Sequence, residues 1–328
     1  MVFLYIGLGL ILLFLIVCFI LAKISHDKFF KYHYEADPDI TLYTNEEFNV
    51  LKDSVEFKDG KATLRGYLYH VDKYDDKKII IYAHGMFSNH NSYMQDICYF
   101  AQRGYLVLGF DYYGVSKSDG KNLKAFGSSI EGVDSAIKYI KNNKELRDND
   151  IYVVGHSWGG YATCNIVKFH PEVKGICALA PFTSVYKIVW YSLPESIRFI
   201  TPMVVLIDYV CGGKYSRCNS IKSLNGYKGN ALLIQSTDDL VVNYDKAGVG
   251  LIKNKATNKN IIYQIEENKG HQPHYTLDGV KLMHEYEAKA RMLKGDELKS
   301  YKHTCDFHKM GKLDPKVMDL IIDKIIND

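Results

Sequence analysis

The sequence predicts an α/β fold built on a parallel sheet. Short apolar segments rich in β-branched residues, as expected for buried strands, recur between segments with helical spacing. One of them, residues 150–154, runs into the pattern Gly-x-Ser-x-Gly at residues 155–159 and then into a helix-compatible segment. The 328 residues, 47% of them hydrophobic, suffice for one such domain and an N-terminal anchor.

The N-terminal segment is predicted to be a membrane anchor over residues 1–22. Residues 2–22 carry no charged side chain, and as a helix they would be about 30 Å long, enough to cross a hydrocarbon core. The alternatives are a cleaved signal peptide and a buried helix. No Lys or Arg precedes the run, which is longer than the roughly 7 to 15 residues of a signal-peptide core. Cys18 follows large apolar residues, which argues against a lipoprotein cleavage site.

Charge and cysteine usage predict that the following domain is cytoplasmic. Lys23, Lys28 and Lys31 follow the span, whereas only the terminal amine precedes it. The seven cysteines are odd in number and irregularly spaced, which favours reduced thiols over a disulfide framework.

A connector over residues 23–53 is expected to lead into one domain, residues 54–328. Residues 54–57 and 62–69 flank Asp59-Gly60 and predict a hairpin. Residues 128–143 predict a crossover helix, because their apolar side chains recur at helical spacing. A further strand is expected at residues 175–180.

The serine in the Gly-x-Ser-x-Gly pattern is a candidate nucleophile. A sharp strand-to-helix turn strains the backbone of Ser157, and the flanking glycines remove Cβ atoms that would collide. The helix N-terminus favours developing negative charge. The alternative is a Gly/Ser-rich turn of any α/β protein. Because a serine hydroxyl is a poor nucleophile alone, the chain must also supply a base, an acid and oxyanion donors.

Two aspartates are candidates for the acid. Residues 231–235 predict a buried strand that ends in acidic residues, at the same edge of the sheet as the serine. Asp239 is favoured because it immediately precedes an apolar turn, residues 240–242, that can pack and hold it. Asp238 is the alternative, and its other role would be to cap the following turn.

Two histidines are candidates for the base. Residues 261–265 predict another strand, which leads through a polar loop to Gly270-His271. A histidine after a glycine in such a loop is free to reach the serine and the acid. His274 is the rival candidate.

The order Ser157, Asp239, His271 resembles that of the α/β-hydrolase superfamily. Two further motifs carry the resemblance: a strand ending in His84-Gly85, and a strand at residues 105–110 followed by Asp-x-x-Gly-x-Ser. The resemblance covers roughly residues 54–328. It implies a mostly parallel central sheet with helices on both faces.

The resemblance also assigns roles around the serine. The residue after His-Gly and the residue after the nucleophile donate backbone N–H groups to the oxyanion, which here implies Met86 and Trp158. His84 is expected to be a structural loop histidine. Asp111 and Ser116 are expected to tie their turn by side-chain to backbone hydrogen bonds.

An insertion at about residues 182–229 is expected to form a lid over the serine, as in the family. Its aromatic and aliphatic side chains would suit an acyl chain or another hydrophobic substrate, received from lipid. The alternative is that these residues only pack the insertion onto the domain. They include Trp190, Tyr191, Phe199, Met203 and Tyr209.

No cofactor, metal or nucleic acid is expected. Residues 303–308 contain two histidines and a cysteine but lack a second ligand pair at recognisable spacing. The net charge is only +3, and no basic stripe with interleaved aromatic residues is present. After His271 the chain is expected to form a charged helical region and a final amphipathic helix over residues 315–326.

These observations predict a membrane-anchored serine hydrolase that cleaves an ester or thioester of a small-molecule or lipid-like acyl substrate. A serine peptidase on the same fold is the alternative, which an amine-binding carboxylate in the lid would favour; Glu195 is the one acid noted there. A noncatalytic, membrane-attached binding scaffold is the alternative from another class.

Overall fold

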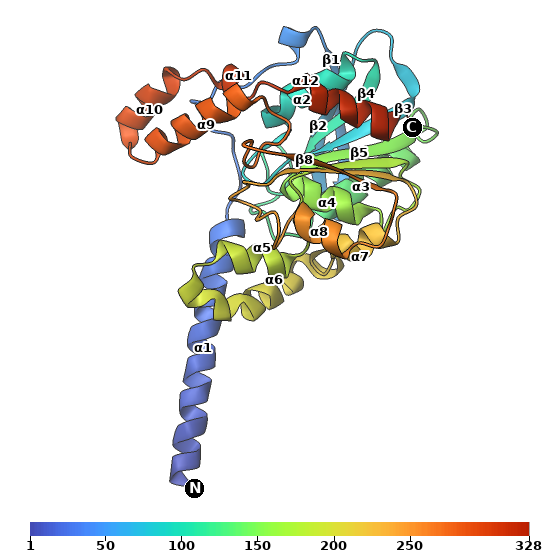
Figure 1. The fold of residues 1–328 in the computed structure, drawn as a ribbon. Helices are drawn as coiled ribbons and strands as arrows, with labels where there is room; N and C mark the ends of the chain where they lie inside the picture. Colours follow the sequence, from blue (N-terminus) through green and yellow to red (C-terminus); the bar gives the residue numbers. More distant parts are fainter. Residues whose placement is uncertain (328) are drawn as a thin grey trace.

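The computed structural model describes residues 1–327, so Asp328, the last residue of the predicted domain, lies outside the described residues. A long N-terminal helix leads into one α/β domain around an eight-stranded sheet (Figure 1). The strand order is β1-β2-β4-β3-β5-β6-β7-β8. The strands are β1 (Leu51–Asp59), β2 (Ala62–His70), β3 (Asp75–Ala83), β4 (Tyr105–Asp111), β5 (Asp150–His156), β6 (Gly175–Leu179), β7 (Asn230–Ser236) and β8 (Ile261–Glu266).

The predicted mostly parallel sheet is confirmed. The strands from β4 through β3, β5, β6 and β7 to β8 pair parallel, and β1 and β2 add an antiparallel edge. The predicted hairpin is present, with Asp59 opposite Ala62. Its turn contains Gly60 at φ 60°, a conformation that glycine adopts without a steric penalty.

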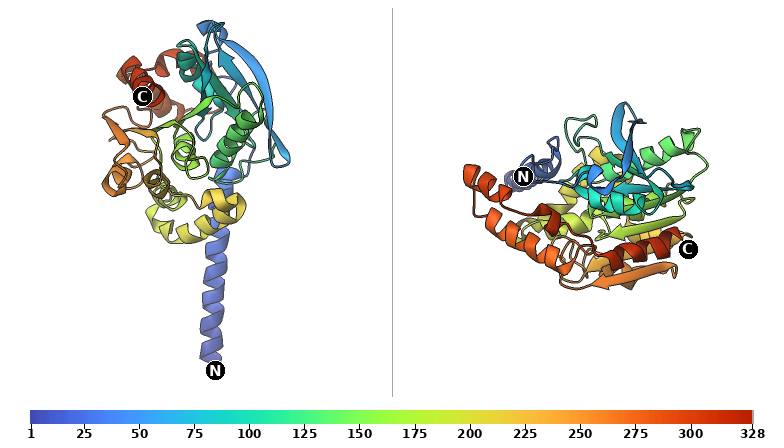
Figure 2. Two further views of the ribbon diagram at one scale, coloured as in Figure 1. Left: turned by 90° about the vertical axis from the view of Figure 1, so that its right-hand side faces the viewer. Right: turned by 90° about the horizontal axis from the view of Figure 1, so that it is seen from above.

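Helices cover both faces of the sheet (Figures 1 and 2). One face carries α2 (Met94–Ala101), α12 (Pro315–Ile321) and the π-helical turn η4 (Ile322–Ile326). The other face carries α3 (Ser128–Asn142), α4 (Trp158–Ile166) and α8 (Val249–Lys255). The crossover helix predicted at residues 128–143 is confirmed as α3, whose four apolar positions are all completely buried, namely Ile130, Val133, Ile137 and Ile140.

The insertion, called the lid segment below (residues 182–229), is helical. It forms α5 (Val185–Ser192), the 3-10 turn η3 (Glu195–Ile200), α6 (Thr201–Ser216) and α7 (Ser220–Asn225). Ile188, Val204 and Val205 of this segment join the domain core. Figure 1 and the left-hand view of Figure 2 place α5 and α6 at the base of the domain, beside the N-terminal helix.

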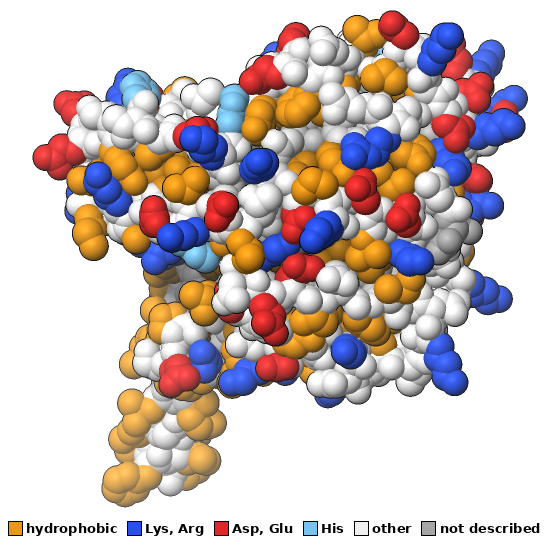
Figure 3. Space-filling view, turned by 45° about the horizontal axis from the view of Figure 1, so that its top comes forward, with side chains coloured by type: hydrophobic (Ala, Val, Ile, Leu, Met, Phe, Trp, Pro, Cys, Tyr) orange, Lys and Arg blue, Asp and Glu red, His pale blue; other side chains and the backbone are white. Residues whose placement is uncertain are grey.

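The N-terminal helix α1 (Val2–Phe30) is longer than the apolar run that predicted it, because it continues for eight residues beyond Ala22. Cys18, Ala22, His26 and Phe30 recur every four residues and are its buried side chains. Since residues four apart share one face of a helix, this stripe packs α1 against the domain, where α6 contacts it. The rest of α1 protrudes and is covered by hydrophobic side chains (Figure 3).

The C-terminal region forms an arm of three helices that projects from the domain (Figure 1). These are α9 (Leu277–Ala290), α10 (Gly295–His303) and α11 (Phe307–Met310). His303 lies 3.2 Å from an oxygen of Asp39, and the ring of His308 stacks on Tyr43 at 3.9 Å between centroids. Within residues 1–327, no three His, Cys, Asp or Glu side chains are placed to hold a metal ion. Short 3-10 turns lie at η1 (Glu46–Phe48) and η2 (His90–Tyr93).

Candidate active site

The structure brings Ser157, Asp239 and His271 together at one edge of the sheet. Ser157 follows β5, Asp239 follows β7, and His271 lies in the loop after β8. These strands run parallel, so their carboxyl ends meet at the same edge, where open α/β sheets bind their ligands.

The turn that carries Ser157 depends on the glycines beside it. Ser157 has φ 56° and ψ −111°, a costly conformation for a residue with a Cβ. A Cβ on Gly159 would lie 1.9 Å from the carbonyl oxygen of Ala83, and one on Gly155 would lie 2.6 Å from the carbonyl oxygen of Gly159. The glycines therefore allow α4 to begin directly against the end of β3.

A line of hydrogen bonds joins the three side chains. The hydroxyl of Ser157 donates to Nε2 of His271 at 2.9 Å, and Nδ1–H of His271 donates to Asp239 at 2.9 Å. The carboxylate acceptor fixes the histidine tautomer that leaves Nε2 free to accept the serine proton. The side chain of Asp239 is completely buried. The imidazole thus stands between an alcohol and a buried carboxylate.

Hydrogen bonds from the turn at residues 240–242 and from Gln235 hold Asp239. Its carboxylate accepts from the backbone N–H groups of Val241 and Val242 at 2.8 and 2.9 Å, and from the Gln235 amide at 2.8 Å. The turn at residues 240–242, which was expected to hold the acid, does so through backbone N–H groups. Of its side chains, that of Val242 is buried and that of Leu240 is 98% exposed. A buried carboxylate is stabilised by donors, which aliphatic contacts cannot replace.

The two rival candidates make other contacts. The carboxylate of Asp238 accepts from the hydroxyl of Ser236 and, at 3.3 Å, from the N–H of Gly270, so it fastens the loop that carries His271. Burial acts to raise the pKa of Asp238, but these hydrogen bonds outweigh it and hold the pKa below its ordinary value. His274 is buried, and its Nε2 lies 3.2 Å from Asp96.

The two backbone N–H groups that were expected to bind the oxyanion, those of Met86 and Trp158, have no hydrogen-bond partner in the part of the chain that the structure describes. Trp158 is the first residue of α4, where helical N–H groups lack an intrahelical partner. Met86 lies in the loop after β3, which is held by the N–H of Gly85 donating to the Tyr93 hydroxyl at 3.2 Å.

Asp111 and Ser116 hold this same loop, whereas we expected them to tie their own turn. Asp111 accepts from both the backbone N–H and Nδ1–H of His90, at 2.9 and 2.8 Å. Ser116 accepts from the side-chain amide of Asn89 at 3.0 Å. The expectation missed these contacts because the partners are more than twenty residues away along the chain.

His156 is a residue of the site that sequence reasoning missed. The Tyr93 hydroxyl donates to its Nδ1 at 2.8 Å, and its Nε2–H donates to the backbone carbonyl of His271 at 2.7 Å. Burial lowers the pKa of His156 well below its ordinary value, so the ring stays neutral and keeps this tautomer. Its place inside the Gly-x-Ser-x-Gly pattern is the only signal in the sequence.

His84 has a structural position. Its Nδ1–H donates to the carbonyl of Gly85 at 2.8 Å, and its Nε2 lies 3.4 Å from the backbone N–H of Tyr112. Burial lowers the pKa of His84 from 6.5 to about 4. The neutral ring therefore supports the loop that carries Met86.

A cleft of about 360 Å³ opens beside His271. Leu240 and Val241 line it on one side, and Met283 and Glu287 of α9 line it on another. The C-terminal arm, for which no role was predicted, thus supplies part of the cleft wall.

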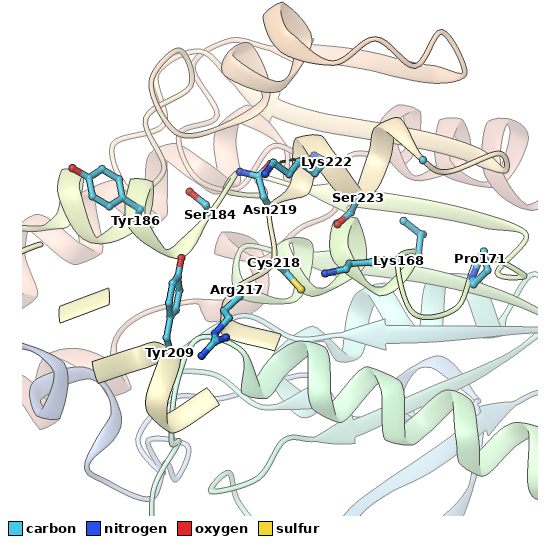
Figure 4. Close-up of a pocket in the computed structure, with 12 residues that line it drawn as sticks. Lys168, Pro171, Ser184, Tyr186, Tyr209, Arg217, Cys218, Asn219, Lys222 and Ser223 are labelled. Atoms are coloured by element: carbon cyan, nitrogen blue, oxygen red, sulfur yellow. Dashed lines mark hydrogen bonds between the residues drawn. The ribbon is translucent and has the colours of Figure 1, made fainter. Parts of the chain in front are cut away.

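A larger groove, of about 570 Å³, lies between the end of α4 and the lid segment (Figure 4). Its charged lining residues are Lys168, Arg217 and Lys222. The candidate catalytic residues Ser157, Asp239 and His271 do not line it. This groove is therefore separate from the candidate active site.

Comparisons with known proteins give one family and several structures. A family model described as serine aminopeptidase, S33, matches residues 74–207, a stretch shorter than half of the chain. No curated protein matches the sequence significantly. The esterase Pf2001 of Pyrococcus furiosus has 21% identity and a TM-score of 0.57, over 76% of this chain and 94% of that chain.

Two further solved structures are similar. Est1E of Butyrivibrio proteoclasticus, solved with ferulic acid bound, has 17% identity and a TM-score of 0.56, over 72% of this chain and 98% of that chain. The α/β hydrolase GrgF of a Penicillium species has 18% identity and a TM-score of 0.54, over 76% and 98%. These likenesses show a shared fold.

We predict that Gly159→Ala destabilises the full-length protein by about 3 kcal/mol, because the new methyl group meets a backbone oxygen that cannot rotate away. Urea unfolding in detergent measures this. The matched control is Gly226→Ala, where φ is −88° and the nearest atom lies 3.7 Å from the added Cβ. Equal stability of the two variants would contradict the close contact of α4 with β3.

We also predict that the protein loses stability as the pH falls from 6.5 to about 4. In this window unfolded His84 binds a proton and folded His84 does not, so the free energy of unfolding decreases with falling pH. His84→Asn, which keeps a donor near the Nδ1 position, should reduce the slope by about 1.4 kcal/mol per pH unit. Urea unfolding at several pH values tests this. The control His303→Asn removes an exposed histidine, and an equal change of slope there would refute the assignment.

Proposed function

We propose that this chain, which has the α/β-hydrolase fold and belongs to that superfamily, is a serine hydrolase that cleaves a carboxylic ester or thioester. The observation that carries the proposal is the line of two 2.9 Å hydrogen bonds from Ser157 through His271 to Asp239. Such a line supplies a nucleophile, a base and an orienting acid.

The proposed reaction has two halves. Ser157 Oγ attacks the carbonyl carbon while His271 Nε2 takes the hydroxyl proton, and the N–H groups of Met86 and Trp158 stabilise the oxyanion. The proton then passes to the leaving alcohol or thiol, and an acyl-enzyme remains. Water attacks the acyl-enzyme with His271 again as base, which releases the acid and restores Ser157. Asp239 stabilises the imidazolium in both halves.

An ester is favoured over a peptide by the cleft wall and by the neighbours. Exposed Leu240 and Val241 beside His271 offer an apolar surface for an acyl group. The esterase Pf2001 is similar at a TM-score of 0.57 over 94% of its own chain. A structure named a putative dipeptidyl aminopeptidase IV, from Bacteroides ovatus, has a TM-score of 0.51 over 35% of its chain, and the family model is described as a serine aminopeptidase.

A serine peptidase is the second candidate, and Glu287 is the observation in its favour. Its carboxylate lines the cleft beside His271, where it would bind the amine of a peptide N-terminus. The nearby Arg291, at 3.7 Å, partly neutralises it. Glu195, the acid noted from sequence, instead pairs with Arg198 at 2.8 Å and does not line this cleft.

We further propose that residues 1–22 anchor the enzyme in a membrane as a single span. Residues 23–53 then form a connector, and the domain from residue 54 onward lies in the cytoplasm. The apolar helix alone is also compatible with a signal sequence. Burial of Cys18 and Ala22 supports retention, because cleavage after them would uncover the core against which they pack. The acyl substrate is a small molecule or a lipid, with no nucleic acid partner.

A fluorophosphonate probe should label Ser157 in the folded protein, and Ser157→Ala should abolish labelling while Ser300→Ala, on the exposed face of α10, should not. Asp239→Asn should lower kcat for an activated ester by about 10³- to 10⁴-fold, because it disturbs the histidine tautomer. Asp238→Asn is the matched control and should cost far less. Absence of an adduct on Ser157 would favour the noncatalytic scaffold.

We expect p-nitrophenyl esters of graded chain length to be hydrolysed with higher kcat/KM than aminoacyl p-nitroanilides. Glu287→Gln should leave the ester rates within about twofold, because an ester has no amine to bind. A dominant anilide activity that Glu287→Gln reduces would establish the peptidase instead.

A further inference from the structure

We propose that η3 and α6 of the lid segment insert into the same bilayer leaflet that the C-terminal half of α1 crosses, so that the domain docks on lipid through the lid. This goes beyond a single-span anchor. It assigns a second membrane contact to residues 199–210 and commits that surface to lipid.

The composition of α6 supports lipid on its outer side. Between Arg198 and Lys214 the only charged residue is Asp208, and Asp208 is completely buried. Phe199, Leu206 and Val210 point outward and are 55%, 60% and 77% exposed. The segment Glu195–Ser216 is long and apolar enough to count as a membrane-spanning candidate by composition. A helix with apolar side chains both on the face toward the domain and on the opposite face is expected to contact an apolar surface on each of these faces.

The contact between the lid segment and α1 fixes the depth of this surface. The ring of Phe199 stacks on that of Phe14 at 6.2 Å between centroids. Phe14 lies eight residues before Ala22, which is about 12 Å along the helix axis. If residues 2–22 cross the hydrocarbon core, the Phe199 ring lies inside that core. The ribbon views agree, because α6 lies across the base of the domain beside α1 (Figures 1 and 2).

The charges around the lid segment match a phospholipid surface. Residues 181–229 contain six basic residues and two acidic ones. Of the two acids, Asp208 is buried and Glu195 is paired with Arg198. The groove in Figure 4 borders α6 and α7, and its charged lining residues are all basic, namely Lys168, Arg217 and Lys222. Basic side chains beside an apolar surface favour headgroup phosphates at the rim.

The loop that carries Met86 lies beside the end of α1, on the proposed membrane side of the domain. Phe29, near the end of α1, lies 6.3 Å from the ring of Phe87, which follows Met86. Phe30 packs on Phe126 at 4.9 Å, and the carbonyl of Phe126 accepts from the Trp158 indole at 2.7 Å. We therefore assign the substrate to acyl esters that reside in the bilayer; this assignment, unlike the docking itself, rests on the proposed hydrolase function.

Depth-dependent quenching tests the docking without any need for activity. Phe199→Cys is introduced into full-length protein carrying Cys211→Ser and Cys305→Ser, since the other cysteines are buried. An environment-sensitive fluorophore is attached, and the protein is reconstituted into phosphatidylcholine vesicles with or without nitroxide-labelled acyl chains. Quenching at position 199 is expected. The matched control is Met292→Cys, an 83% exposed apolar position beyond α9, which should not be quenched.

The outcomes of this measurement are distinct. Quenching at 199 but not at 292 supports the insertion. Equal, weak quenching at both positions overturns it. A blue-shifted emission at 199 without lipid quenching also overturns it, and would assign the surface to a second copy of the chain.

A second arm tests the substrate class. The triple variant Phe199→Ser/Leu206→Ser/Val210→Ser should hydrolyse a soluble short-chain ester at the wild-type rate. Its rate on a long-chain ester embedded in vesicles should fall about tenfold, because burying even one such side chain in lipid strengthens membrane binding by at least that factor. Met292→Ser should change neither rate. Equal losses on both substrates, or none, would reject bilayer-resident esters. A wild-type protein inactive on the soluble ester would reject the hydrolase, while the quenching result would still decide the docking.

Discussion

The candidate site depends on one close approach of backbone to backbone, where the first turn of α4 rests against the end of β3. Gly159 lies so near the carbonyl of Ala83 that no other residue fits. Ser157, two residues before Gly159, has its unusual dihedrals, φ 56° and ψ −111°, in the same turn. The close approach of Gly159 also brings the start of α4, which carries the N–H of Trp158, against the backbone of Ala83 and His84, which leads into Met86. A single steric constraint thus positions the candidate nucleophile and both candidate donors.

A buried polar network then ties the remaining parts to that turn. The N–H of Gly85 reaches the Tyr93 hydroxyl, the hydroxyl reaches His156, and His156 reaches the backbone of His271. Asp238 fastens the same loop from the strand side through Gly270. Because groups buried at low dielectric lose much when a partner is removed, such a network resists loosening at any one point. The imidazole is therefore held through its backbone as well as through its ring.

Local sequence pattern was sufficient for the elements that meet at the sheet edge. The strands, the Gly-x-Ser-x-Gly turn and the hairpin at Gly60 can each be recognised from a few neighbouring residues. The candidates Ser157, Asp239 and His271 were then found from their positions after three of these strands. Contacts between distant segments could not be predicted in this way. The role of His156, the bonds of Asp111 to His90, and the share of α9 in the cleft all depend on tertiary packing. In the same way, the apolar residue types at positions 240–242 do not reveal that the backbone N–H groups of this turn hold Asp239.

The unbroken course of α1 from its first turn to Phe30 has a mechanical meaning. A flexible connector would let the domain change its orientation above the bilayer. A continuous helix whose Ala22 and Phe30 side chains are buried against the domain instead holds the domain in one orientation relative to the helix axis. On the proposed membrane placement, the height and tilt of the candidate site relative to the bilayer are then constant. For the proposed hydrolase, the search for substrate would be two-dimensional diffusion at a fixed orientation, and molecules in an opposing membrane would lie out of reach.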